Sequence, residues 1–130
     1  MKKYLITLIF GTRPEAIKLA PIIIKLKAEN DFNLRVILTG QHKEMVSQVL
    51  DIFKIEVNKN FDLMKEKQTL NYITSRTINE LKKEFELNRP DLVLVQGDTT
   101  SAFAAALAAF YDQIPVGHVE AGLRTKFLND

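Results

Sequence analysis

Hydrophobic residues along the chain gather first into short, nearly continuous runs. Four such runs are rich in Val, Ile, Leu and Phe without clean alternation, which is typical of strands covered on both faces of a parallel sheet. They span residues 4–10, 34–39, 91–96 and 115–119. A weaker signal in "NFDLM", residues 60–64, predicts one further short strand.

Between these runs the apolar positions recur at helical spacing. This periodicity predicts helices over residues 14–29, 43–53, 70–87 and 99–111. Pro14 suits a first helical position, whereas Pro21 removes a hydrogen bond to Ile17 and predicts a kink or a break. Strands alternating with helices predict right-handed crossovers and a doubly wound parallel sheet of the α/β class.

Composition limits the classes of function. The chain has 130 residues, 46% hydrophobic and 26% charged, which fits one globular domain. A net charge of +2 without a basic block gives no indication of nucleic-acid binding. The absence of cysteine excludes disulfides and thiolate metal sites, and the two histidines, His42 and His118, are too far apart for a metal-binding signature.

The N-terminal apolar run must be distinguished from a signal peptide. Two lysines precede it, but it is short and ends in Gly-Thr-Arg-Pro where a small-residue cleavage site would be needed. We interpret it as the first strand of a soluble, cytoplasmic protein. No apolar stretch approaches the roughly 20 residues that span a bilayer, so no membrane association is predicted.

Polar side chains follow each predicted strand. The segments are "GTRPE", "TGQHKEM", "QGDTTS" and "GHVEAGLRT". Ligands of open parallel sheets bind beyond the carboxyl ends of the strands, so we expect these segments to meet at one edge. The residues expected to converge there are Arg13, Gln41, His42, Asp98, Glu120 and Arg124.

Arg13 has two interpretations. A guanidinium beside a helix N-terminus suits a phosphate, because the helix dipole and the amides favour an anion and the guanidinium binds two oxygens. Alternatively, Arg13 reaches solvent or pairs with Glu15. Lys18 lies one turn into the same helix and can reach either Glu15 or the same anion; taken alone, it is a surface lysine.

The other polar residues also have structural alternatives. Asp98 by itself fits an N-cap of the following helix, and His118 by itself fits a buried core histidine. Gln41 and His42 fit loop caps. Glu120 ends a buried strand, and there it needs either a partner such as Arg124 or His118, or a role in catalysis.

Three common signatures are absent from the sequence. No Gly-x-Gly-x-x-Gly follows the first strand, which argues against a dinucleotide-dependent oxidoreductase. There is no P-loop and no Gly-x-Ser-x-Gly elbow of an α/β-hydrolase.

Four segments together, "FGTRPEAIK", "QHKEM", "QGDTTSAFAAALAAFY" and "IPVGHVEAGLRT", resemble the non-hydrolysing UDP-N-acetylglucosamine 2-epimerases. They match in order over essentially all 130 residues. The resemblance implies a glycosyltransferase-B-like fold of two Rossmann-like halves with the active site in the cleft between them. Residues 1–130 would form the N-terminal Rossmann-like domain, and the C-terminal nucleotide-binding domain would be absent.

The resemblance also implies an isomerase activity. The family interconverts UDP-GlcNAc and UDP-ManNAc for bacterial surface polysaccharides, by eliminating UDP to 2-acetamidoglucal and adding it back. Asp98 and Glu120 match catalytic carboxylates, Arg13 matches a UDP-contacting arginine, and Lys18 matches a lysine important for activity. The family implies a homodimer and no metal or redox cofactor.

In some bacterial members a second UDP-GlcNAc binds beside the active site as an activator. Gln41 matches one of its contacts. Lys67 stands where the family usually has an arginine, and lysine cannot make the bidentate contact. Gln96 is a second departure, because the family often has a histidine there; we expect its effect to be mild.

The chain stops before the family's third carboxylate and its C-terminal half. We therefore expect an N-terminal fragment that is inactive alone, because catalysis needs groups preorganised on both sides of the substrate. The alternatives are a non-catalytic module for nucleotide-sugar binding or dimerisation, a gene remnant, or half of a related glycosyltransferase. The substrate is either UDP-GlcNAc or a related UDP-sugar such as a diacetamido sugar.

Overall fold

A computed structural model describes residues 3–40, 43–63 and 68–119, with the side chains of 43–45 left out. Its centre is a parallel sheet of five strands in the order β3-β2-β1-β4-β5. The strands are β1 (Tyr4–Phe10), β2 (Phe32–Leu38), β3 (Lys59–Asn60), β4 (Leu92–Gln96) and β5 (Val116–Val119). The helices are α1 (Arg13–Lys27), α2 (Lys43–Ile52), α3 (Leu70–Leu87) and α4 (Thr100–Tyr111).

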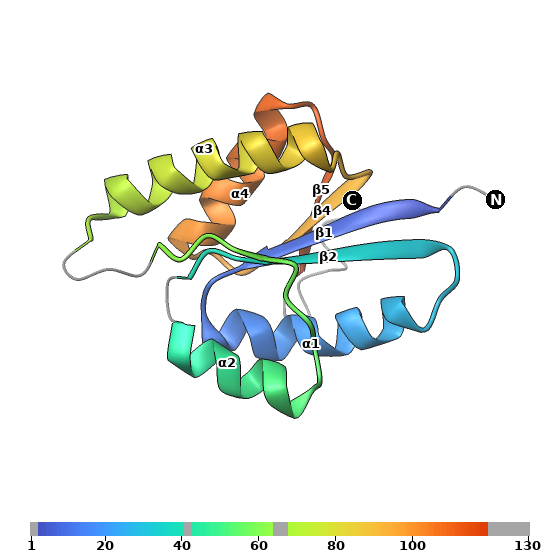
Figure 1. Cartoon of the computed structure of the whole chain (residues 1–130). Helices are drawn as coiled ribbons and strands as arrows, with labels where there is room; N and C mark the ends of the chain where they lie inside the picture. The colour runs from blue at the N-terminus through green and yellow to red at the C-terminus, as the bar shows by residue number, and fades with distance from the viewer. Residues whose placement is uncertain (1–2, 41–42, 64–67, 120–130) are drawn as a thin grey trace, which may run out of the picture.

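Helices cover both faces of the sheet, α1 and α2 on one and α3 and α4 on the other (Figure 1). Successive residues of β1 point to opposite faces. Leu8 and Phe10 therefore join the core under α1 and α2, while Ile9 joins the core under α3 and α4. Burial on both faces explains why the strands read as continuous apolar runs. The predicted doubly wound α/β fold is confirmed.

The strand order determines where a ligand can enter. The chain adds β2 and β3 on one side of β1, then crosses to add β4 and β5 on the other side. This is a Rossmann-like order, and the crevice lies where the order reverses, between the carboxyl ends of β1 and β4.

The predicted elements exist with small differences in their bounds, except that the short strand expected in residues 60–64 lies at Lys59–Asn60, and residues 61–63 are not strand. The main difference is α1, which runs without a break through Pro21. Pro21 is exposed, while its neighbours Leu19, Ala20 and Ile23 are fully buried against the sheet. Packing of this face holds the helix together despite the missing amide, so of the predicted kink or break, the break does not occur. Within the described ranges, no helix is both long and apolar enough to cross a membrane.

Candidate active site

A cavity of about 440 Å³ lies at the point where the strand order reverses. The loop between β1 and α1 forms one side, and the loop between β4 and α4 forms the other. Three residues selected from the sequence, Arg13, Lys18 and Asp98, lie at this cavity together. Its lining residues are Thr12, Arg13, Pro14, Glu15, Lys18, Gln96, Gly97, Asp98 and Thr99.

Helix α1 begins with a capping box at one side of the cavity. Thr12 is the N-cap, and its Oγ1 accepts a hydrogen bond from the Glu15 amide at 3.4 Å. The Glu15 side chain, 1% exposed, turns back to the loop. Its Oε1 accepts hydrogen bonds from the Gly11 amide at 3.0 Å, the Thr12 amide at 2.9 Å and the Thr12 hydroxyl at 2.8 Å. Satisfying these donors fixes the entry of the chain into the helix.

Glu15 therefore does not pair with Arg13 or Lys18, and the two alternatives that paired them with Glu15 are wrong. Both cationic side chains are exposed, and among the described residues they form no ion pair. The amides of Gly11 and Thr12 are already bonded to Glu15, and Pro14 has no amide hydrogen. An anion at this helix start would therefore depend mainly on the side chains of Arg13 and Lys18, more than on backbone amides.

Helix α4 begins at the opposite side of the cavity, and its N-cap is Thr99. The Thr99 hydroxyl accepts a hydrogen bond from the Ala102 amide at 3.1 Å. It donates to Oε2 of Glu15 at 2.8 Å. The interpretation of Asp98 as the cap is thus wrong, because the neighbouring threonine takes that position.

Asp98 is exposed at the cavity. Within the described ranges its carboxylate has no hydrogen bond or ion pair. Gly97, just before it, has a φ of 75°, a conformation that glycine adopts without strain. The turn at Gly97 ends β4 and releases Asp98 from the sheet. Asp98 is thus available to a ligand, with no structural role of its own among these residues.

His118 lies on β5, beside β4 in the sheet. It is exposed, so the interpretation as a buried core histidine is wrong. Its Nε2 lies 2.6 Å from the carbonyl oxygen of Gly97. This contact joins the end of β5 to the loop that carries Asp98.

The remaining predicted site residues, Gln41, His42, Lys67, Glu120 and Arg124, lie outside the described residues. Their convergence on the cavity stays a prediction. In the part of the chain that the structure describes, no group of three His, Asp or Glu side chains is placed to hold a metal ion.

Glu15 is the site residue whose position sequence reasoning missed. The signal was present, because Thr12-Arg13-Pro14-Glu15 has the spacing of a capping box. Chemically, the cavity combines two cations with one carboxylate, and none of the three has a partner among the residues that the structure describes. Such a set can hold an anionic group and act on an adjacent part of the same ligand.

Comparison with known proteins points to one family. A sequence model described as UDP-N-acetylglucosamine 2-epimerase matches residues 24–129. A UDP-N-acetylglucosamine 2-epimerase of Bacillus subtilis (strain 168) is 53% identical over 125 residues, which are 96% of this chain and 33% of that protein. The chain thus spans about a third of the length of this curated relative.

Solved structures agree with the sequence comparison. A crystal structure of UDP-N-acetylglucosamine 2-epimerase superposes with a TM-score of 0.86 at 51% identity, covering 99% of this chain and 35% of that one. The UDP-GlcNAc 2-epimerase from Neisseria meningitidis, bound to UDP-GlcNAc, superposes with a TM-score of 0.86 at 50% identity, covering 96% and 34%. The described chain has the Rossmann-like fold of the N-terminal part of these glycosyltransferase-B-like proteins. By sequence and by fold, the chain belongs to the UDP-N-acetylglucosamine 2-epimerase family.

Proposed function

We propose that residues 1–130 form the N-terminal Rossmann-like domain of an enzyme that interconverts UDP-GlcNAc and UDP-ManNAc. A C-terminal nucleotide-binding domain would supply the opposite wall of the cleft. The observation that carries the proposal is the shared cavity of Arg13, Lys18 and Asp98. Glu15 and Thr99 make the capping hydrogen bonds at the starts of α1 and α4. The side chains of Arg13, Lys18 and Asp98 are therefore not needed as caps and are available to a substrate.

The charges at the cavity match the proposed chemistry. The hydrogen on sugar C2 is not acidic, so the reaction proceeds by elimination and re-addition of UDP. Arg13 and Lys18 hold the diphosphate and stabilise the charge that develops as it leaves. Asp98, together with Glu120, supplies the acid and base groups for the sugar carbons.

The choice of ligand is supported by the Neisseria meningitidis relative, whose structure holds UDP-GlcNAc. A related UDP-sugar has the same diphosphate and would use the same two cations. We also propose that Gln41 and Lys67 contact a second, activating UDP-GlcNAc. Lys67 would bind it less tightly than an arginine, because lysine makes no bidentate contact.

We further propose that the protein is a cytoplasmic homodimer. The support is the outer face of α4, where Phe103, Phe110 and Tyr111 are exposed. Large apolar side chains gathered on one helix face are typical of a protein interface. A second copy of the chain would cover them.

A chimera tests the proposed activity. Residues 1–130 are fused to the part of the Bacillus subtilis relative that lies beyond the matched segment, and formation of UDP-ManNAc is followed by proton NMR. We expect the chimera to form UDP-ManNAc and the 130-residue chain alone to form none. A folded chimera without activity would contradict the proposal and favour the alternative of a non-catalytic binding or dimerisation module.

A further inference from the structure

We infer that Glu15 is a positioning residue, which holds the loop carrying Arg13 in register with the loop carrying Asp98. This inference rests on the proposed function for the roles of Arg13 and Asp98. The coupling itself rests on contacts in the described structure. Glu15 is buried and lines the cavity, and its two carboxylate oxygens accept hydrogen bonds from two different loops.

The two oxygens of Glu15 bind the N-caps of two helices. Oε1 accepts from the hydroxyl of Thr12, the N-cap of α1, at 2.8 Å. Oε2 accepts from the hydroxyl of Thr99, the N-cap of α4, also at 2.8 Å. A carboxylate only accepts, so both hydroxyls must donate to it. One side chain thereby fixes two helix starts that lie on opposite faces of the sheet (Figure 1).

Each capping threonine is adjacent in sequence to a proposed functional residue. Arg13 directly follows Thr12, and Asp98 directly precedes Thr99. The Thr99–Glu15 bond joins residues 84 positions apart and crosses from one loop to the other. A shift of either loop would therefore change the distance between the proposed phosphate-binding cation and the proposed catalytic carboxylate.

The chemistry of the contacts requires a carboxylate of this length. The Glu15 side chain meets only donors, namely two amides and two hydroxyls. Glutamine has the same shape but is neutral. Its NH₂ group in place of Oε1 would face the Gly11 and Thr12 amides and leave them unsatisfied, and in place of Oε2 it would reverse the Thr99 bond into a weaker neutral one. Aspartate keeps the charge but is one methylene shorter, so it would not span the two loops.

The first test measures binding of inorganic pyrophosphate to the 130-residue chain by ³¹P NMR titration. Glu15→Gln should weaken binding about tenfold, because the cations lose their fixed position. Thr99→Val should weaken it to a similar extent, and the double variant should be no weaker than either single one. Thr99→Ser, which keeps the hydroxyl, is the matched control and should bind like the parent chain.

The second test needs no ligand and measures amide hydrogen exchange. The Ala102 amide bonds to Thr99 Oγ1, which in turn bonds to Glu15. If the loops are coupled, Glu15→Gln should speed exchange at Ala102 at least about tenfold more than at the buried strand residues Val93 and Val95. A purely local role would speed exchange only at Gly11 and Thr12.

The outcomes separate the inference from the proposed function. Failure of the parent chain to bind pyrophosphate, or unchanged binding by Arg13→Ala, would count against the proposed phosphate site; the exchange at Ala102 would then decide the inference alone. If Glu15→Gln does not fold, Thr99→Val against Thr99→Ser supplies the same comparison. A folded Glu15→Gln chain with parental affinity and parental exchange at Ala102 would overturn the role of Glu15.

Discussion

At the scale of single residues, burial separates three charged side chains that are neighbours in the sequence. Arg13, Glu15 and Lys18 lie within two turns of α1, and pairing among them was a reasonable expectation. In the structure Glu15 is buried among hydrogen-bond donors, while the two cations face the cavity. A capping box explains the difference, because unsatisfied amides at a helix start compete effectively for a nearby carboxylate.

Substitution of Arg13 tests its proposed contact with the diphosphate. In the chimera, Arg13→Ala should raise KM for UDP-GlcNAc about 10- to 100-fold, because a charge-assisted contact to the diphosphate is lost. Arg13→Lys should fall between the parent and the alanine variant, since it keeps the charge and loses the bidentate geometry. Steady-state kinetics provides the measurement.

Arg76→Ala is the matched control for Arg13. Arg76 is an exposed arginine on α3 that pairs with Glu80 of the same helix, and it does not line the cavity. Its removal should leave KM unchanged. Equal kinetics for the Arg13 and Arg76 alanine variants would contradict a phosphate-binding role for Arg13.

At the scale of elements, the sequence predicted the strong periodic segments well. The bounds of β1 and α3 agree with the prediction at both ends. The edge strand β3 has only two residues, too few to show an alternation that could define its bounds. The continuity of α1 through Pro21 was also not predictable, because it depends on packing against a sheet that local propensity does not describe.

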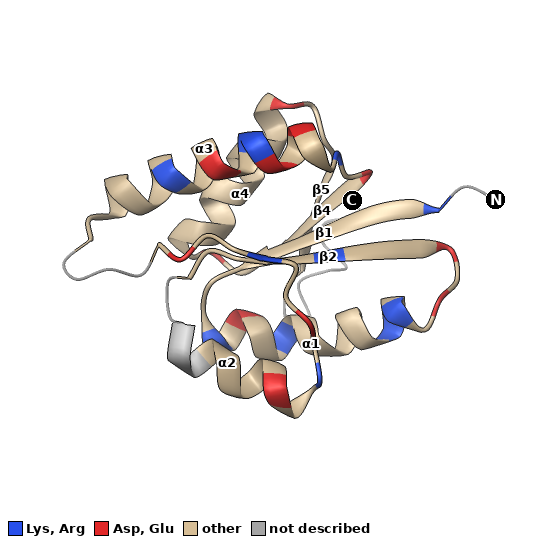
Figure 2. Cartoon of the chain, in the orientation of Figure 1, with Lys and Arg blue, Asp and Glu red and all other residues tan. Residues whose placement is uncertain are grey.

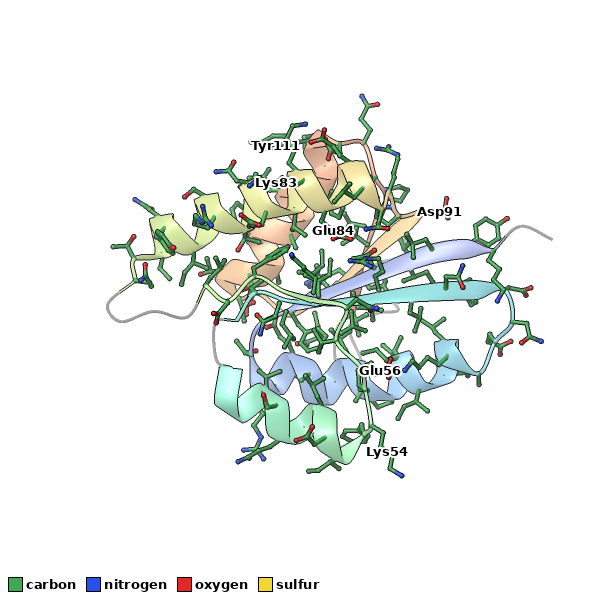
Figure 3. All side chains as sticks on the ribbon, viewed as in Figure 1. Lys54, Glu56, Lys83, Glu84, Asp91 and Tyr111 are labelled. Carbon is green, nitrogen blue, oxygen red and sulfur yellow. The ribbon has the colours of Figure 1, made fainter. Side chains whose placement is uncertain are left out.

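One partly buried ion pair between elements was not predicted from the sequence. Arg35 of β2 and Glu84 of α3 form two hydrogen bonds, Nε–Oε2 at 2.6 Å and Nη2–Oε1 at 3.1 Å. Glu84 is 6% exposed and lies between α3 and the sheet (Figure 3). The two residues are 49 positions apart, so no local pattern connects them. The visible signals were a lone arginine in an apolar strand and a glutamate on the buried side of a helix.

The Arg35–Glu84 pair should contribute measurably to the stability of the fold. Glu84→Ala should lower the free energy of unfolding by about 3 kcal/mol, because Arg35 would be left as a partly buried charge without its partner. Glu80→Ala is the control, since among the described residues Glu80 pairs only with exposed side chains of the same helix, Arg76 at 3.3 Å and Lys83 at 3.7 Å. Its cost should stay below about 1 kcal/mol.

Urea denaturation of both variants gives the comparison. Equal decreases in the free energy of unfolding for Glu84→Ala and Glu80→Ala would show that the Arg35–Glu84 pair does not stabilise the packing of α3 on the sheet.

At the scale of the whole molecule, α4 has two apolar faces. Its small side chains, including Ala104, Ala105 and Ala108, are buried in the core. Its large ones, Phe103 and Phe110, are 61% and 72% exposed. The helix carries no charged residue, in contrast to α3 (Figure 2). The sequence predicted a helix here, but only the structure shows which of its faces remains uncovered.

The exposed face of α4 can be tested as the proposed homodimer interface by substitution. If it forms the homodimer interface, Phe103→Asp combined with Phe110→Asp should convert a dimer into a monomer, because each protomer would bury two carboxylates at the interface. Analytical ultracentrifugation measures the mass. Ile24→Asp, at an exposed apolar position of α1, is the control and should leave the dimer intact. A dimer that survives the double substitution would place the interface elsewhere.

The candidate site is assembled from segments that are far apart in the sequence. The sequence located Arg13 and Asp98 because parallel strands align their carboxyl ends at one edge of the sheet, and Lys18 because it lies one turn into the helix that begins at Arg13. It did not locate the Thr99–Glu15 bond, because that bond joins the loop after β1 to the loop after β4, which are far apart in the sequence. Glu120 follows β5 in the sequence, and its role remains a prediction because it lies outside the described residues.

The most direct test of the account concerns Asp98 as a group that acts on the sugar. UDP-GlcNAc is incubated in D₂O with the chimera, and the C2 proton signal is followed by NMR. The parent chimera should lose this signal as deuterium enters from solvent, and Asp98→Asn should slow the loss by at least about a hundredfold. An Asp98→Asn chimera that exchanges the C2 proton at the parental rate would contradict the account.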